Sequence, residues 1–216
     1  MGISSGKSCR GTDAVPLHKQ TEQFGSAWQI LPYLLESPFQ TMERDKKIFR
    51  TFSAPVLRFY RWARPAVSFG RTRGIENQIE RAALEKGWQV VGRPTGGGIV
   101  EHANDLCFSL FWPKTDSTFP WKVADSYAAI HEWIAEGLKE LGVETSSVYQ
   151  KNRETGWCFQ TAVCHDLVAD GKKIVGGAQW REKDKALHQG SIQTPLPPTA
   201  VSVLEEKFRN KFGVIG

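Results

Sequence analysis

The stretch RPTGGGIVEH, residues 93–102, constrains this chain most, because three successive glycines separate two runs of strand-forming residues. Residues 88–91 read as a strand before the loop, and the apolar residues 106–112 predict a buried strand after it. Glycine permits positive φ and lets a ligand lie against bare backbone N–H groups. A flexible turn is the alternative interpretation. The arginine and histidine that bracket the loop, Arg93 and His102, favour a ligand site.

Three segments of the chain carry motifs: the glycine-loop segment RPTGGGIVEHANDLCFSLFW, the upstream segment RFYRWARPAVSFGRTRGIE and the downstream segment GKKIVGGAQWRE. Together, and in this order, they resemble the lipoate ligase and octanoyltransferase family of the biotin/lipoate protein ligase superfamily. The resemblance covers roughly residues 28–193. It implies an α/β fold of the α+β type, with a mixed, largely antiparallel sheet flanked by helices.

The resemblance also implies which residues form the site. A lysine directly before Ile-x-Gly, Lys173 here, would hold the acyl carbonyl oxygen and stabilise the charge that develops on it. The residues expected to bind the substrate are Arg93, Gly96, Gly97, Gly98, His102, Gly176, Gly177 and Gln179. The chain departs from the family pattern at two places. The family usually has two arginines directly before the glycine loop, whereas this chain has Gly92-Arg93. The family also usually has a histidine directly followed by glycine near the end of the domain, whereas this chain has His188-Gln189-Gly190.

Cys158 is the candidate nucleophile. Cys158-Phe159 precedes Asp166 by eight residues, which resembles the spacing in the cysteine-dependent octanoyltransferases, whereas ligases carry a Gly-Arg-Asn-Asp type run here. The simpler interpretation is a small buried hydrophobic residue beside aromatics. Cys164 is the rival thiol, because the adjacent His165 could lower its pKa.

Length and composition indicate one ordinary globular domain. The polar residues 1–23 are expected to form a mobile tail, and residues 24–216 a single catalytic domain without an accessory C-terminal domain. No apolar run approaches the roughly 20 residues that a membrane span needs. The four cysteines have no zinc-finger spacing, and the sequence shows no secretory context. We therefore expect reduced thiols and a cytoplasmic location.

The net charge of +5 includes a group of arginines at positions 58, 61, 64, 71 and 73. A solvated basic face is one interpretation. An acidic protein partner is the other, since complementary charge speeds encounter. The resemblance implies such partners: acyl carrier protein and lipoyl domains, such as the glycine cleavage H protein or a 2-oxoacid dehydrogenase E2. No nucleic-acid-binding module is recognisable.

Several elements are predicted by local pattern. Residues 56–62 read as a strand, and a helix with apolar positions up to Ala83 should end at Gly87. A second helix, capped by Asp125 or Ser126, should end at Gly142. Asp170-Gly171 predicts a type I′ hairpin turn. A terminal helix should pack Leu204, Phe208 and Phe212 on the core.

These features together predict an acyltransferase. An octanoyl or lipoyl group would pass from a carrier-protein thioester or donor domain to Cys158, and then to a lysine of a lipoyl domain. An ATP- and magnesium-dependent ligase that forms lipoyl-AMP is the alternative, and a non-catalytic lipoyl-domain binding module is the third. We expect no cofactor for the transferase. We also expect no metal, because we find no His, Cys and carboxylate set at metal-ligand spacing.

Overall fold

The computed structural model describes residues 28–71, 83, 85–148 and 164–214. The expected N-terminal tail, Cys9, Arg73, Cys158 and most of the helix expected before Gly87 lie outside the described residues. Within them, no helix is long and apolar enough to cross a membrane.

The fold is α/β and is built on a seven-stranded sheet that is antiparallel except for its first pair, β1 and β2. β6 and β10 occupy the middle of this sheet and pair along their whole length. In spatial order, the strands are β1 (Gln29–Glu36), β2 (Val56–Trp62), β6 (Leu106–Pro113), β10 (Lys185–Ile192), β9 (Lys172–Arg181), β8 (Leu167–Ala169) and β7 (Ser146–Ser147).

A second, three-stranded sheet carries the glycine loop. Its central strand β3 (Ala66–Phe69) pairs in parallel with β4 (Gln89–Gly92) and antiparallel with β5 (Ile99–His102). The loop of residues 93–98 connects β4 to β5, so it leaves one edge of the small sheet and returns at the other. β5 then leads by a short turn into β6 of the large sheet.

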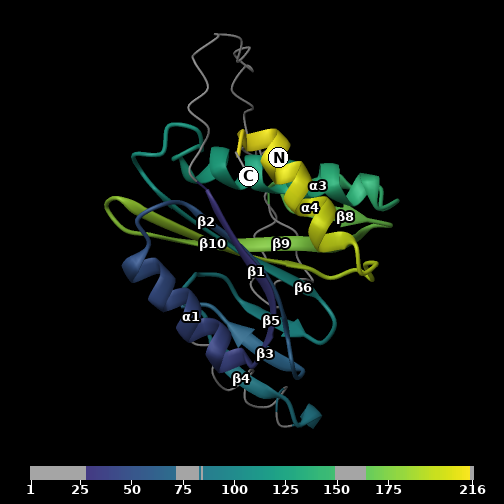
Figure 1. Cartoon of the computed structure of the whole chain (residues 1–216). Coiled ribbons are helices and arrows are strands. Elements are labelled where there is room, and N and C mark those ends of the chain that lie inside the picture. Colours follow the sequence, from purple (N-terminus) through teal and green to yellow (C-terminus); the bar gives the residue numbers. More distant parts are fainter. Residues whose placement is uncertain (1–27, 72–82, 84, 149–163, 215–216) are drawn as a thin grey trace, which may run out of the picture.

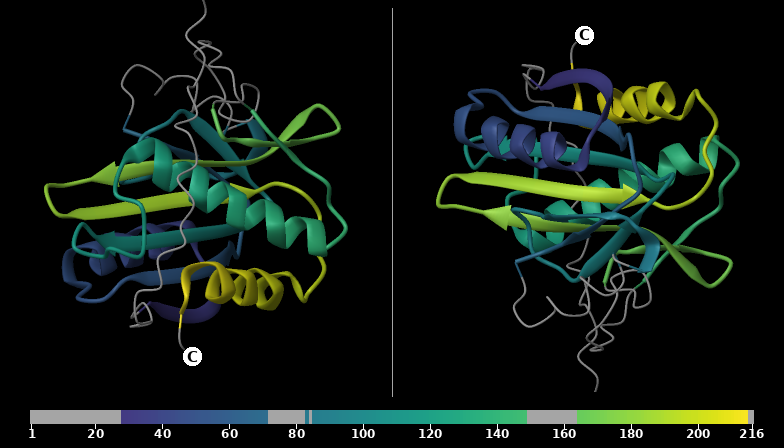
Figure 2. Two further views of the ribbon diagram at one scale, coloured as in Figure 1. Left: turned by 90° about the horizontal axis from the view of Figure 1, so that it is seen from above. Right: turned by 90° about the horizontal axis from the view of Figure 1, so that it is seen from below.

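The helices lie on the two faces of the large sheet (Figure 1). α3 (Val123–Glu140) and α4 (Ala200–Phe212) pack together on one face, as the view from above in Figure 2 also shows. α1 (Pro38–Thr51) and the small sheet lie on the other face. The main apolar core fills the space between the sheet and the α3/α4 layer, with Phe108, Trp133 and Phe208 wholly buried in it.

The helix ends follow local sequence. Ser37 and Gln40 form a reciprocal capping box at the start of α1, and Gly213 ends α4 with a left-handed φ of 63°. The predicted cap of α3 was wrong. That helix begins at Val123, and its N-cap is Lys122, three or four residues before the predicted cap and without a side-chain hydrogen bond. The Ser126 hydroxyl donates to the Val123 carbonyl instead.

Other predicted elements are confirmed. Asp170 and Gly171 both have positive φ, 49° and 71°, as a type I′ turn between β8 and β9 requires. Leu204 and Phe208 of α4 are wholly buried, and Gly87 has a φ of 62° directly after the described helical residues.

Candidate functional site

Arg93 holds the glycine loop from within. Its side chain is buried, and its guanidinium donates to the carbonyls of Gly96 (3.2 Å) and Gly98 (2.9 Å). The same guanidinium donates to the Ser68 hydroxyl of β3 at 2.5 Å. Three N–H donors of one planar group thus fix two loop carbonyls and the neighbouring strand.

Two glycines make the loop path possible. Gly97 is exposed and has a φ of 88°, a conformation that side chains other than glycine rarely adopt. Gly70, at the end of β3, lies so close to the loop that a methyl group there would overlap backbone atoms of Gly96 and Gly97. The Gly70 N–H donates to the Gly98 carbonyl at 3.3 Å.

The base of the loop is tied to β10 by Thr95, whose hydroxyl donates to Gln189 Oε1 at 2.8 Å. The Gln189 amide nitrogen donates in turn to Asp45 Oδ2 of α1 at 2.7 Å. Gln189 follows His188, and successive strand residues face opposite sides of a sheet. The order His-Gln-Gly therefore turns glutamine toward the glycine loop and histidine toward α3.

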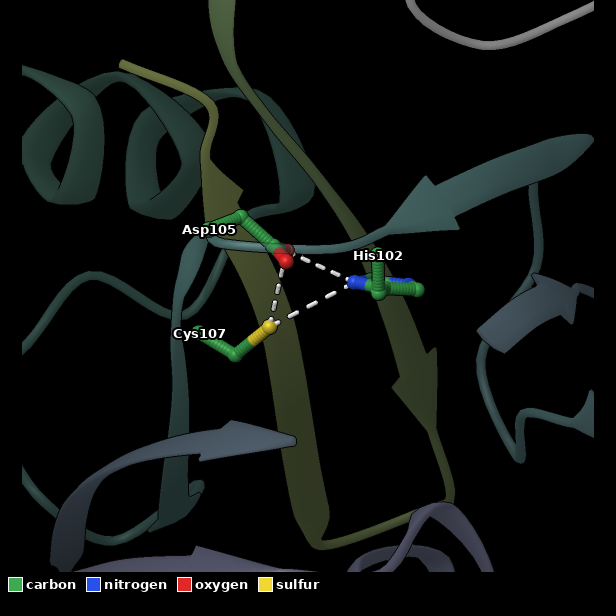
Figure 3. Close-up of side chains that lie close together, drawn as sticks. All are labelled: His102, Asp105 and Cys107. Carbon is green, nitrogen blue, oxygen red and sulfur yellow. Dashed lines mark hydrogen bonds and ion pairs between the residues drawn. The ribbon is translucent and has the colours of Figure 1, made fainter. Parts of the chain in front are cut away.

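His102 lies in a buried cluster at the other end of β5 (Figure 3). Its Nδ1 is 2.6 Å from Asp105 Oδ2, its Nε2 is 2.7 Å from the Ser68 hydroxyl, and its ring stacks on Trp62. Since Arg93 donates to that hydroxyl, Ser68 connects the histidine to the arginine that holds the loop. In this arrangement His102 supports the loop through Ser68 and Arg93.

His102, Asp105 and Cys107 form a potential metal-ligand set that our sequence analysis missed, although His-x-x-Asp-x-Cys spans one tight turn between β5 and β6. The distance of 2.6 Å between Nδ1 and Oδ2 is that of a hydrogen bond. Two ligands of one tetrahedral zinc stand roughly 3.3 Å apart. The Cys107 thiol donates to the same carboxylate oxygen at 3.1 Å. In the structure, the three residues form a hydrogen-bond cluster.

The pKa shifts of Cys107 and Asp105 agree with that arrangement. Burial and the neighbouring Asp105 carboxylate raise the pKa of the Cys107 thiol well above its usual value, so it stays protonated. Burial also acts to raise the pKa of Asp105, but His102 and the hydrogen bonds from His102, Ser191 and Cys107 outweigh it and lower that pKa.

Lys173 lies just after the hairpin turn and is not a solvent-facing lysine. Its side chain is 7% exposed, and its Nζ is 2.7 Å from Oδ2 of Asp166, which is wholly buried. The side chain occupies the space beside Gly176, where an added methyl group would lie 2.8 Å from Nζ. Gly176 therefore makes room for the lysine itself. In the same way, the space beside Gly177 is filled by Nε2 of His188.

The Gln179 side chain lies on the side of β9 that faces α3. Its amide nitrogen donates to the Ser126 hydroxyl at 3.1 Å and approaches His188 Nδ1 at 3.3 Å, and its oxygen accepts from Arg181. These contacts tie Gln179 to the start of α3.

The thiols differ in their settings. Cys107 is buried in the cluster described above and is free. Cys164 is half-buried at the edge of the described residues and is disulfide-bonded, in contrast to the reduced thiol that the sequence predicted. Cys158 lies outside the described residues.

The arginines predicted to form one basic group lie partly in the interior and partly on the surface. Arg58 is not on the surface, because it is 1% exposed and pairs with Asp45 (2.6 Å) and Glu36 (2.5 Å). A side chain on the middle of β2 faces the interior beside α1, which a pattern of basic residues alone cannot reveal. Arg64 and Arg71 are exposed, and Arg61 lines a cavity of about 620 Å³ together with Trp88, Glu101 and Asp105, among others.

Comparison with known proteins identifies the family. Residues 37–202 match the family described as the lipoyl protein ligase A/B catalytic domain. The chain belongs to this family. The match includes the glycine loop, the His102 cluster and the Lys173–Asp166 pair.

Within this family, the chain is similar to proteins named octanoyltransferase LipM. The chain is 35% identical over 182 residues to octanoyltransferase LipM of an Exiguobacterium species (78% of this chain, 66% of the relative). It is 31% identical over 179 residues to octanoyltransferase LipM of Staphylococcus epidermidis (76% and 65%). The chain thus spans slightly less than two thirds of the length of these relatives.

Solved structures show the same fold. A putative lipoate protein ligase from T. acidophilum with bound lipoic acid has a TM-score of 0.73 at 19% identity, covering 88% of this chain and 86% of that one. Lipoate-protein ligase A bound with ATP has a TM-score of 0.70 at 22% identity, covering 84% and 85%.

Proposed function

We propose that this lipoyl protein ligase A/B family member is an octanoyltransferase. It would move an octanoyl group, or a lipoyl group, from a carrier-protein thioester or a donor domain onto the ε-amine of a lipoyl-domain lysine. The observation that carries this proposal is the 35% identity to a named octanoyltransferase over 78% of the chain. The buried Lys173 beside Gly176 adds a cation of the kind such a site requires.

The proposed reaction has two covalent steps. The thiolate of Cys158 attacks the carbonyl carbon of the donor thioester, a new C–S bond forms, and the carrier thiol leaves after taking up a proton. The acceptor amine then attacks the acyl-Cys158 thioester, an amide C–N bond forms, and Cys158 leaves as thiolate while the amine loses its proton. Splitting the transfer in this way replaces one difficult step by two easier ones.

Lys173 would stabilise the oxygen of each tetrahedral intermediate. A buried ammonium is effective there because the surroundings screen its charge weakly. Asp166 keeps the cation in place before substrate arrives, at a distance of 2.7 Å. The glycine loop, held by Arg93, would place its backbone beside the acyl group, where an N–H group can donate to the acyl carbonyl oxygen. The transfer as written consumes no cofactor and no metal.

The proposed partners are acidic proteins: an acyl carrier protein as donor, and a lipoyl domain such as glycine cleavage H protein or a dehydrogenase E2 as acceptor. One structural neighbour is described as a bi-partite lipoate protein ligase studied with its E2 lipoyl domain. The exposed Arg64 and the half-exposed Arg61 supply positive charge for such encounters.

The intact mass of the protein tests this proposal. After incubation with octanoyl carrier protein under reducing conditions, we expect one added octanoyl group, removable by hydroxylamine and located on the Cys158 peptide. Cys158→Ser should lose both the adduct and nearly all turnover, because an unactivated hydroxyl is a far weaker nucleophile than a thiolate. Cys107→Ser and Cys164→Ser are the controls and should keep the adduct. An adduct on Cys164 would move the nucleophile, and an active Cys158→Ser protein would overturn the covalent mechanism.

A second incubation separates the transferase from a ligase. With octanoate or lipoate, ATP and magnesium, we expect no pyrophosphate, no acyl-AMP and no modified acceptor. Formation of acyl-AMP would instead identify an ATP-dependent ligase. If neither incubation modifies the acceptor but the acceptor binds, the chain is a non-catalytic lipoyl-domain binding module.

A further inference from the structure

The partners of Asp166 come from α3 as well as from β9. The Tyr127 hydroxyl of α3 donates to Asp166 Oδ1 at 2.7 Å, while Oδ2 of the same carboxylate contacts Lys173. The two oxygens are thus held from opposite sides, one by a neutral donor and one by a cation. Asp166 itself is wholly buried and directly precedes β8.

The Tyr127 hydroxyl also contacts the backbone of β9 at Gly177, beyond the part of β9 that pairs with β8. β8 pairs with β9 only as far as Leu167 opposite Val175, so Gly177 has no β8 partner. The Gly177 N–H donates to the Tyr127 oxygen at 3.0 Å, and the Gly177 carbonyl lies 3.0 Å from the same oxygen. One hydroxyl therefore fixes β9 and Asp166 together at the place where the sheet ends.

His131 acts one helical turn further along α3, on the residue before Asp166. Side chains four residues apart in a helix lie on the same face. His131 Nδ1 is 2.7 Å from the His165 carbonyl, and since a carbonyl only accepts, Nδ1 carries the proton. Burial lowers the pKa of His131 to about 4, so the ring is neutral at pH 7.

His165 has an unusual backbone conformation that needs such support. Its φ of 72° is in the left-handed region, which costs free energy for a residue other than glycine. Its N–H donates to the Val148 carbonyl at 2.7 Å, and its carbonyl accepts from His131. This turn brings the Asp166 carboxylate to face Lys173.

We propose that Tyr127 and His131 are positioning residues that set the place of the Lys173 ammonium through Asp166 and the His165 turn. The proposal rests on the proposed function in so far as Lys173 acts on the acyl carbonyl. Its geometric part, that α3 fixes the Lys173–Asp166 pair, is independent of any activity.

The first test is kinetic. Tyr127→Phe removes one hydroxyl, and we expect the single-turnover rate of acyl transfer to fall roughly 10- to 100-fold with KM for the carrier protein nearly unchanged. His131→Ala should act in the same direction, and His131→Asn should restore most of the rate, because an amide N–H can replace Nδ1–H. Tyr33→Phe, on the far edge strand β1, is the matched control and should be unchanged. A wild-type rate in Tyr127→Phe, or equal losses in His131→Asn and His131→Ala, would overturn the proposal.

The second test needs no substrate. NMR of the lysine ammonium groups should show a protected Lys173 signal, assigned by its loss in Lys173→Arg. In folded Tyr127→Phe, and in folded His131→Ala, this signal should shift or broaden while the other lysine signals stay in place. An unaltered Lys173 signal contradicts the positioning role even if the protein transfers no acyl group. An altered signal in a protein without transferase activity leaves the positioning role intact and refutes only the proposed function.

Discussion

Gly70→Ala tests whether the glycine loop must sit where Arg93 holds it. The added methyl group would overlap the carbonyl carbon and oxygen of Gly96 and the carbonyl oxygen of Gly97. All of these are backbone atoms, so no side chain can rotate away. Restoring ordinary contact distances requires the loop to move by roughly 1 Å.

The size of the effect follows from that displacement. Overpacking of this kind costs about 1–3 kcal/mol of unfolding free energy, which lowers the Tm of a chain this long by roughly 2–4 °C per kcal/mol. A shift of about 1 Å in a substrate-positioning group can cost roughly 100-fold in rate. We therefore expect a folded protein, moderately less stable, whose rate of octanoyl transfer is about two orders of magnitude lower.

The assay is single-turnover transfer from octanoyl carrier protein, measured beside thermal unfolding of the same preparation. Gly92→Ala is the matched control, because its added methyl group meets the Phe69 ring at 3.2 Å and a ring can give way. If Gly70→Ala unfolds at the expected temperature but transfers as fast as the control, the loop position does not govern catalysis and the reasoning is refuted.

Three further outcomes follow from the structure. Lys173→Ala should slow acylation roughly 100-fold and also lower stability, since it leaves Asp166 buried without its cation. In urea unfolding, the double variant Lys173→Met/Asp166→Asn should be more stable than Lys173→Met alone, while its acylation rate should stay as low. Reversing Arg61 and Arg64 to Glu should lower the second-order rate with carrier protein and flatten its salt dependence, with single-turnover chemistry constant in stopped flow; an unchanged salt dependence contradicts the role of this charge in encounter. His131 has its pKa lowered from 6.5 to about 4 by burial, so the unfolded chain takes up its proton first as pH falls. The contribution of the neutral His131 ring to the free energy of unfolding is therefore complete above pH 6.5 and falls by about 3 kcal/mol toward pH 4. Urea unfolding across this pH range should show a smaller decline in His131→Asn.

Local chemistry explains which elements the sequence predicts. The Asp170-Gly171 turn and the end of the helix at Gly87 depend on backbone conformations that their residues prefer, so pattern alone indicates them. The cap of α3 could not be predicted in this way, because Ser126 lies inside the helix and its hydroxyl bonds within the first turn and to Gln179 and Arg181. Tertiary contacts outweigh the capping preference there.

The candidate site shows the same division. The glycine loop and Lys173 stand out in the sequence, but their partners come from distant segments without a motif. Tyr127 is 39 residues from Asp166, and Ser68 is 25 residues from Arg93. The buried Arg58 was also misplaced by pattern, because a cation with two carboxylate partners can be buried where an unpaired one cannot. The family resemblance supplied positions, and only the structure supplied the contacts between them.

The amide of Gln189 has a consequence for how the chain folds. It joins the glycine loop at Thr95, 94 residues away in sequence, to Asp45 of α1, 144 residues away. Contacts of such separation form only after much of the chain has already been ordered, because closing long loops costs entropy first. We therefore expect the loop to take its final conformation late in folding, after β10 has joined the sheet. In a refolding experiment, recovery of transfer activity should lag behind the recovery of secondary structure.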